Sequence, residues 1–205
     1  MFSENLARVA VFVSGSGSNL QALMDATKAG ILSARIALVV SNRRDAYGLE
    51  RASNAGVAGF VFKAKKYGSE EKAGEVLLAK LREHEVDYIA LAGYLRLLPG
   101  AVVREYRHRI VNIHPALLPK YGGKGMYGHY VHEAVIASGD KESGVSVHLV
   151  DEIYDHGQVL EQVKVPVMPG DTPDDLAGRV LKQEHKIYAR VLDKLINGKC
   201  ELKIE

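Results

Sequence analysis

Residues 7–19 read ARVAVFVSGSGSN, an apolar run rich in valine that ends at a cluster of glycine and serine. A continuous apolar run of this length is typical of a strand that is buried on both faces of a parallel sheet. Residues 18–28 then change to helical spacing, with apolar side chains three and four positions apart available for one face. The stretch therefore predicts a strand, a tight turn and a helix, which form the first half of a βαβ unit.

The same alternation of apolar strand and amphipathic helix continues along the chain. Further strands are expected at residues 34–40, 57–63, 86–94, 109–113, 145–151 and 158–165, and helices at 46–56, 72–84 and 171–198. The last two strands alternate polar and apolar residues and follow one another closely, which indicates an antiparallel excursion. We therefore predict a single Rossmann-like α/β domain over residues 1–205. Its sheet is expected to be mostly parallel and twisted, with an antiparallel strand near the C-terminus and helices on both faces.

Composition limits the classes of function. The 205 residues are 47% hydrophobic and 25% charged, which suits one globular core. A formal net charge of +2 is too small to indicate nucleic-acid binding. One cysteine, Cys200, allows no internal disulfide, and the first apolar run is too short for a membrane span. We expect a cytoplasmic protein with no membrane anchor and no nucleic-acid partner.

The glycine-rich stretch Ser14–Asn19 joins the first strand to the first helix. Backbone N–H groups at a helix N-terminus, with small residues that permit close approach, make an anion site. The third glycine of the dinucleotide fingerprint is replaced by Leu20, which favours a phosphomonoester. Arg43 and Arg44 keep an NADP site open as an alternative, and a plain tight turn is the third interpretation.

Asn112 and His114 stand two positions apart at the end of the fifth expected strand, so they share one face. Pro115 restrains the backbone of His114, and glycines and a further proline keep the next segment irregular. An amide N–H and an imidazolium N–H can stabilise an oxygen that becomes negative during attack on a carbonyl. A buried pair satisfied by backbone partners is an equally good interpretation of these two residues alone.

Two other segments carry ionisable residues. His129 and His132 are three apart, but no further ligands cluster with them, so we expect a solvated helix face rather than a metal site. The loop between the last two strands offers Asp151, Glu152 and Asp155 just before a glycine turn. A carboxylate there could orient His114 and favour its charged form.

Five segments together resemble the folate-dependent formyltransferase family: SGSGSNLQAL (14–23), LAGYLRLL (91–98), VNIHPALLPKYGG (111–123), GVSVHLVDEIYDHGQVLEQ (144–162) and QEHKIY (183–188). The resemblance covers nearly the whole chain. It implies an enzyme that transfers the formyl group of 10-formyltetrahydrofolate, its co-substrate, to the amine of glycinamide ribonucleotide in purine synthesis. It implies no metal, only small-molecule partners, and a monomer or homodimer.

The resemblance also implies roles for individual residues. The catalytic trio would be Asn112, His114 and Asp155. The substrate phosphate and ribose would be held by Gly17, Ser18, Asn19 and Glu184. The folate would lie against Leu91, Leu95, Arg96, Leu97, Leu98, Asn112 and Asp151.

The chain departs from the family pattern in two places. The segment 122–132 is longer than in many relatives, so no contact is carried over to it. Where some relatives offer a basic residue to the folate tail this chain has Glu70, and Lys63, Lys65 or Lys66 could substitute for it. Relatives that act on a tRNA carry an additional C-terminal domain, and relatives that hydrolyse formyl-folate carry an N-terminal one. We expect neither here.

Overall fold

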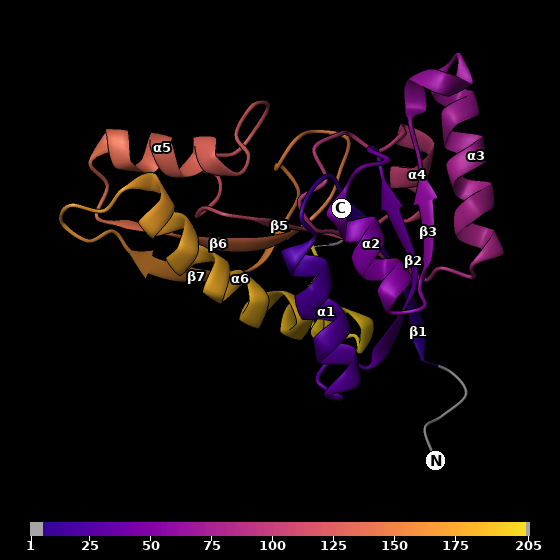
Figure 1. Cartoon of the computed structure of the whole chain (residues 1–205), viewed down its shortest axis with the longest axis horizontal. Helices are drawn as coiled ribbons and strands as arrows, with labels where there is room; N and C mark the ends of the chain where they lie inside the picture. The colour runs from indigo at the N-terminus through magenta and orange to yellow at the C-terminus, as the bar shows by residue number, and fades with distance from the viewer. Residues whose placement is uncertain (1–5, 204–205) are drawn as a thin grey trace.

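The computed structural model describes residues 6–203, so both ends of the predicted 1–205 domain lie outside the described residues. Seven strands form one sheet, and helices connect most of them (Figure 1). The elements are β1 (Ala7–Val13), α1 (Ser18–Lys28), β2 (Ala34–Ser41), α2 (Tyr47–Asn54), β3 (Ala58–Val61), η1 (Ala64–Tyr67), α3 (Glu70–Glu83), β4 (Tyr88–Leu91), α4 (Gly100–Glu105), β5 (Ile110–His114), α5 (His129–Ser138), β6 (Glu142–Leu149), β7 (Val159–Pro166) and α6 (Pro173–Ile196).

The strand order is β3-β2-β1-β4-β5-β6-β7. Strands β1 to β5 pair in parallel, whereas β6 runs antiparallel to both of its neighbours. The predicted fold class, a mostly parallel sheet with an antiparallel strand near the C-terminus, is confirmed. The chain changes direction across the sheet after β3, because β4 returns to the other side of β1.

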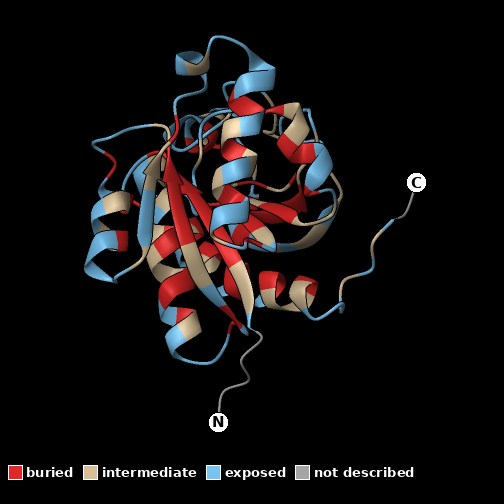
Figure 2. Ribbon diagram, turned by 90° about the vertical axis from the view of Figure 1, so that its right-hand side faces the viewer, coloured by how far each residue is buried: buried red, intermediate tan, exposed pale blue. Residues whose placement is uncertain are grey.

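Helices cover both faces of the sheet, as predicted. One core joins the sheet to α1, α2, α5 and α6, and a second core on the opposite face joins it to α3 and α4. Figure 2 shows the central strands buried between helices whose outer surfaces are exposed. Two short elements, η1 and α4, were not predicted, because four and six residues are too few to give a helical period.

The long helix α6 begins and ends where its sequence signals indicate. Thr172 caps it through a reciprocal capping box with Asp175, and Pro173 occupies the first turn. The fully buried hydroxyl of Tyr188 donates to the carbonyl oxygens of Leu91 and Val111, at 2.8 and 3.2 Å. This contact ties α6 to the last residue of β4 and to the first half of β5. Within residues 6–203 no helix combines the length and apolar character needed to cross a membrane.

We predict that Tyr188→Phe lowers the free energy of unfolding by about 1–2 kcal/mol, because it removes a buried hydroxyl that two carbonyl groups share. Urea denaturation would measure the difference. Tyr67→Phe is the matched control, since the structure gives the Tyr67 hydroxyl no hydrogen bond within the described residues. Equal stability of the two variants would contradict a structural role for the Tyr188 hydroxyl.

Candidate active site

A cavity of about 660 Å³ opens at the carboxyl ends of β4 and β5, beside the first turn of α1. Open α/β sheets bind ligands at this edge, where the strand order changes direction. Residues from the loop after β4, the end of β5, the segment 123–129 and α6 form its walls. The cavity gathers the following residues predicted from the sequence: Asn19, Leu95, Arg96, Asn112, His114, Asp155 and Glu184.

A narrower cavity of about 60 Å³ lies beside the first and shares Tyr94, Arg96, Asn112, Tyr154 and Asp155 with it. The other residues predicted for the folate, Leu91, Leu97, Leu98 and Asp151, line this narrower cavity. The carboxylate of Asp151 is already engaged, because it accepts from the Ile153 amide at 2.8 Å and contacts His156 at 2.7 Å.

Two residues predicted for the phosphate, Gly17 and Ser18, lie outside the main cavity. Ser18 lines a separate cavity of about 500 Å³, and Gly17 lines none of the three. Gly17 caps α1 with φ 70°, and a Cβ atom there would lie 2.7 Å from the Cα atom of Gly48. Only glycine therefore fits this turn against the start of α2. Of the predicted phosphate loop, Asn19 alone faces the main cavity.

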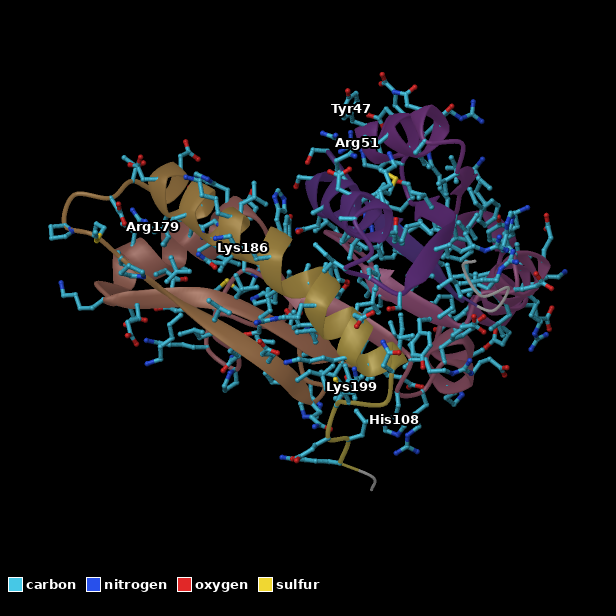
Figure 3. All side chains as sticks on the ribbon, turned by 90° about the horizontal axis from the view of Figure 1, so that it is seen from below. Tyr47, Arg51, His108, Arg179, Lys186 and Lys199 are labelled. Atoms are coloured by element: carbon cyan, nitrogen blue, oxygen red, sulfur yellow. The ribbon has the colours of Figure 1, made fainter. Side chains whose placement is uncertain are left out.

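A cation from α2 supports the glycine loop. The guanidinium of Arg51 donates to the Ser16 carbonyl oxygen at 2.8 Å and to Gln21 at 3.1 Å. It also lies 4.8 Å from the ring centroid of Tyr47, and the two residues project together from α2 (Figure 3). The positive charge therefore stands next to the first turn of α1, where the helix dipole also favours anions.

Asn112 is held by two acceptors. Nδ1 of His148 lies 2.8 Å from the Leu149 carbonyl oxygen, so Nδ1 carries the hydrogen and Nε2 accepts from the Asn112 amide at 3.0 Å. The second amide hydrogen points to Oδ1 of Asp155 at 3.3 Å. Both hydrogens of Asn112 are thus engaged. A ligand oxygen must displace one of these acceptors, and the longer contact to Asp155 is the weaker one.

His114 is buried, and its two ring nitrogens have different surroundings. Nε2 lies 2.8 Å from the carbonyl oxygen of Tyr121, whereas Nδ1 lies 3.6 Å from Oδ2 of Asp155. Burial lowers the pKa of His114 below its ordinary value of 6.5, although Asp155 and the Tyr121 carbonyl act in the opposite sense. The Asp155 carboxylate therefore favours the charged form of His114, as expected, but burial has the larger effect on the pKa.

Asp155 is the common neighbour of these side chains. Its Oδ2 also accepts from the Gly123 amide at 2.9 Å. Burial raises the pKa of Asp155, but the adjacent His148 and His114 rings and the Gly123 amide outweigh burial and place the pKa below its ordinary value. Asp155 is therefore ionised at neutral pH, and it faces a histidine that can take up a proton.

Asn19 and Glu184 form a second polar pair in the same cavity, although 165 positions separate them in the sequence. Nδ2 of Asn19 donates to Oε2 of Glu184 at 2.8 Å, and Oδ1 of Asn19 is buried without a partner within the described residues. Burial raises the pKa of Glu184, and the bond from Asn19 opposes the shift. A buried polar atom that lacks a hydrogen-bond partner in the wall of a cavity is typical of a site that binds a polar ligand.

His132 was missed by the sequence reasoning. We expected a solvated helix face at 129–133, yet His132 is only 5% exposed and lines the main cavity. Its Nδ1 has no hydrogen-bond partner among residues 6–203, and no group of three or more possible metal ligands gathers there. The spacing of Val131 and Val135 marks the buried face of α5 and could have placed His132 beside it.

Comparison with known proteins gives consistent results. The family model described as "Formyl transferase" matches residues 7–192. The chain is 44% identical over 197 residues to phosphoribosylglycinamide formyltransferase, chloroplastic, of Vigna unguiculata, which covers 96% of this chain and 62% of that protein. It is 41% identical over 194 residues to phosphoribosylglycinamide formyltransferase of Escherichia coli (strain K12), covering 95% of this chain and 89% of that one.

A solved structure is also similar to this chain over nearly the whole length of both. Glycinamide ribonucleotide transformylase 1 from Symbiobacterium toebii superposes with a TM-score of 0.90 at 37% identity. The match covers 98% of this chain and 92% of that chain. The chain thus spans less than two thirds of the Vigna unguiculata protein but nearly all of the bacterial structure.

The depressed pKa of His132 predicts a pH effect on stability. Burial, with His129 and His114 acting in the same sense, lowers this pKa from 6.5 to about 4. Between these values the unfolded chain binds a proton that the folded chain does not, so stability is lost as pH falls from 6.5 to 4, by at most about 3 kcal/mol. His132→Leu should remove this loss. Denaturant titrations at several pH values would measure it, and a constant difference between the two proteins would contradict the assignment.

Proposed function

The chain belongs to the formyl transferase family of enzymes, and from that membership we propose that it transfers the formyl group of 10-formyltetrahydrofolate to the amine of glycinamide ribonucleotide in purine synthesis. The observation that carries this proposal is the meeting of Asn112, His114 and Asp155 in one cavity. The same cavity contains the Asn19–Glu184 pair, so one space offers both reactive and substrate-binding groups. We treat residues 1–205 as one formyltransferase domain, a monomer or homodimer, that works in the cytoplasm.

We place the glycinamide ribonucleotide at the α1 end of the main cavity. The helical hydrogen bonds of α1 begin with the amide of Gln21, which donates to the Gly17 carbonyl oxygen. The amides of Ser18, Asn19 and Leu20 therefore have no partner within the helix. These amides and the adjacent Arg51 suit a phosphate group, which would lie where Asn19 of the main cavity adjoins Ser18 and Arg51 of the separate cavity. The carboxyl group of Glu184 lies beside Asn19 and can accept hydrogen bonds from the ribose hydroxyls of the same substrate.

We place the formyl-folate at the end of the main cavity that lies next to β4. Leu95 and Leu97 are large apolar side chains that are 42% and 47% exposed at the cavity mouths. An aromatic ring system laid against them would remove this apolar surface from water. Leu91 and Leu98 line the narrower cavity beneath, and Asn112 stands where the formyl group would reach the catalytic residues.

The proposed reaction is a direct attack of the substrate amine on the formyl carbon. Binding both reactants in one cavity replaces a bimolecular encounter. The tetrahedral intermediate carries an oxyanion, to which Asn112 donates once the ligand displaces Asp155 from its amide. A protonated His114 donates to the same oxygen, and Asp155 stabilises the imidazolium. The amine loses one proton and N10 of the folate gains one, so the step is balanced without a covalent enzyme intermediate or a metal.

The test is consumption of 10-formyltetrahydrofolate followed by absorbance, with and without glycinamide ribonucleotide. We expect consumption only when the ribonucleotide is present, with formylated ribonucleotide as product. Consumption at the same rate without the ribonucleotide, with release of formate, would make the protein a hydrolase of formyl-folate and overturn the proposal. Binding of NADP, detected by energy transfer from tyrosine, would support a dinucleotide-binding protein instead.

We predict that Asn112→Ala or His114→Ala lowers kcat by roughly 10²-fold or more, the usual scale for the loss of an oxyanion donor. The expected change in KM for either substrate is small, because these groups act on the charge that develops during attack. His84→Ala, at the C-terminal end of α3, is the control and should keep the original kcat. Near-normal turnover of either active-site variant would remove that residue from the mechanism.

A further inference from the structure

The turn between β5 and α5 contacts both ionisable members of the catalytic trio. The carbonyl oxygen of Tyr121 lies 2.8 Å from Nε2 of His114, and the amide of Gly123 donates to Oδ2 of Asp155 at 2.9 Å. A Cβ atom on Gly122 would lie 2.6 Å from a Leu118 methyl group and 3.3 Å from Cβ of Asp155. The turn therefore packs closely against Asp155, and a side chain at position 122 would require Leu118 to move.

The Tyr121 carbonyl determines which nitrogen of His114 carries a hydrogen. A carbonyl oxygen can only accept a hydrogen bond, so at 2.8 Å Nε2 must be the donor. The partner of one ring nitrogen sets the tautomer of a histidine and so defines the role of the other nitrogen. In neutral His114, Nδ1 is then the bare nitrogen, and it is the one that lies 3.6 Å from Asp155.

The side chain of Tyr121 anchors its own carbonyl. Tyr121 has φ 57°, a conformation that is uncommon for a residue with a large side chain. Its hydroxyl donates to Oδ2 of Asp140 at 2.7 Å and lies 2.6 Å from Oγ of Ser138. Asp140 also pairs with Lys120 on the same turn. Ser138 ends α5 and Asp140 follows it, so the phenol ties the turn to the C-terminal end of that helix.

We propose that Tyr121 is a positioning residue for catalysis. Its carbonyl fixes His114 with the hydrogen on Nε2, and the contact of its phenol with Asp140 holds that carbonyl in place. His114 therefore acts on the substrate through Nδ1, while Nε2 stays committed to the turn. The role in catalysis rests on the proposed formyl transfer, whereas the fixed tautomer does not depend on it.

The first test observes the tautomer directly, by nitrogen NMR of protein labelled with ¹⁵N-histidine at neutral pH. The signals of His114 are assigned by their loss in His114→Ala. We expect a protonated Nε2 and a bare Nδ1 in the unchanged protein, and averaging of the two nitrogens in Tyr121→Phe. A hydrogen on Nδ1 in the unchanged protein would overturn the proposal, whatever the variant does.

The second test measures kinetics. Tyr121→Phe should lower kcat by roughly 10- to 100-fold, the scale of a small misplacement of a catalytic group, with little change in KM for either substrate. Tyr67→Phe removes a hydroxyl that does not line the cavity and should leave kcat and the His114 signals unchanged. Thermal unfolding checks that Tyr121→Phe is folded.

The outcomes of the two tests separate the alternatives. Unchanged kcat in folded Tyr121→Phe would overturn the positioning role, and so would a fall in kcat without a change in the His114 signals. If the unchanged protein transfers no formyl group to glycinamide ribonucleotide but shows the fixed tautomer, the proposed function fails while the tautomer assignment stands.

Discussion

The antiparallel pairing of β5 with β6 is the constraint on which the site depends. It places Asn112 opposite His148 and His114 opposite Ser146, because residues two apart on one strand face residues two apart on its partner. Because β6 is antiparallel, its last residue, Leu149, pairs with Val111 near the start of β5. The loop 150–158 then turns back along β5 and brings Asp155 to Asn112 and His114.

Asp155 contacts the side chains that this register aligns. Its backbone adopts φ 54°, a left-handed conformation that aspartate and asparagine tolerate better than most residues. Its side chain is 10% exposed and lies against Asn112, His114, His148 and the amide of Gly123. The burial that depresses the pKa of His114 also strengthens each of these contacts, because the local dielectric is low. His114 lies beside the ionised carboxylate of Asp155 and can therefore take up a proton during the reaction.

The sequence predicted the features that depend on local pattern. The apolar run at 7–13 predicts a buried strand of a parallel sheet. The two-residue spacing of Asn112 and His114 predicts that their side chains lie on the same face of a strand. The trio itself came from the family resemblance, since nothing local distinguishes Asp155 from Asp151. The Asn19–Glu184 pair joins residues 165 positions apart, which no local pattern can reveal. The role of Tyr121 depends on a backbone carbonyl, and every residue type carries one.

The central claim is that the ionised carboxylate of Asp155 makes the trio work. Measurement of kcat and both KM values for Asp155→Asn tests it most directly, because asparagine keeps the shape and tolerates the same backbone conformation while removing the charge. The account predicts a fall in kcat of roughly 10²-fold or more, with both KM values changed only a few-fold. A kcat close to that of the unchanged enzyme would contradict it.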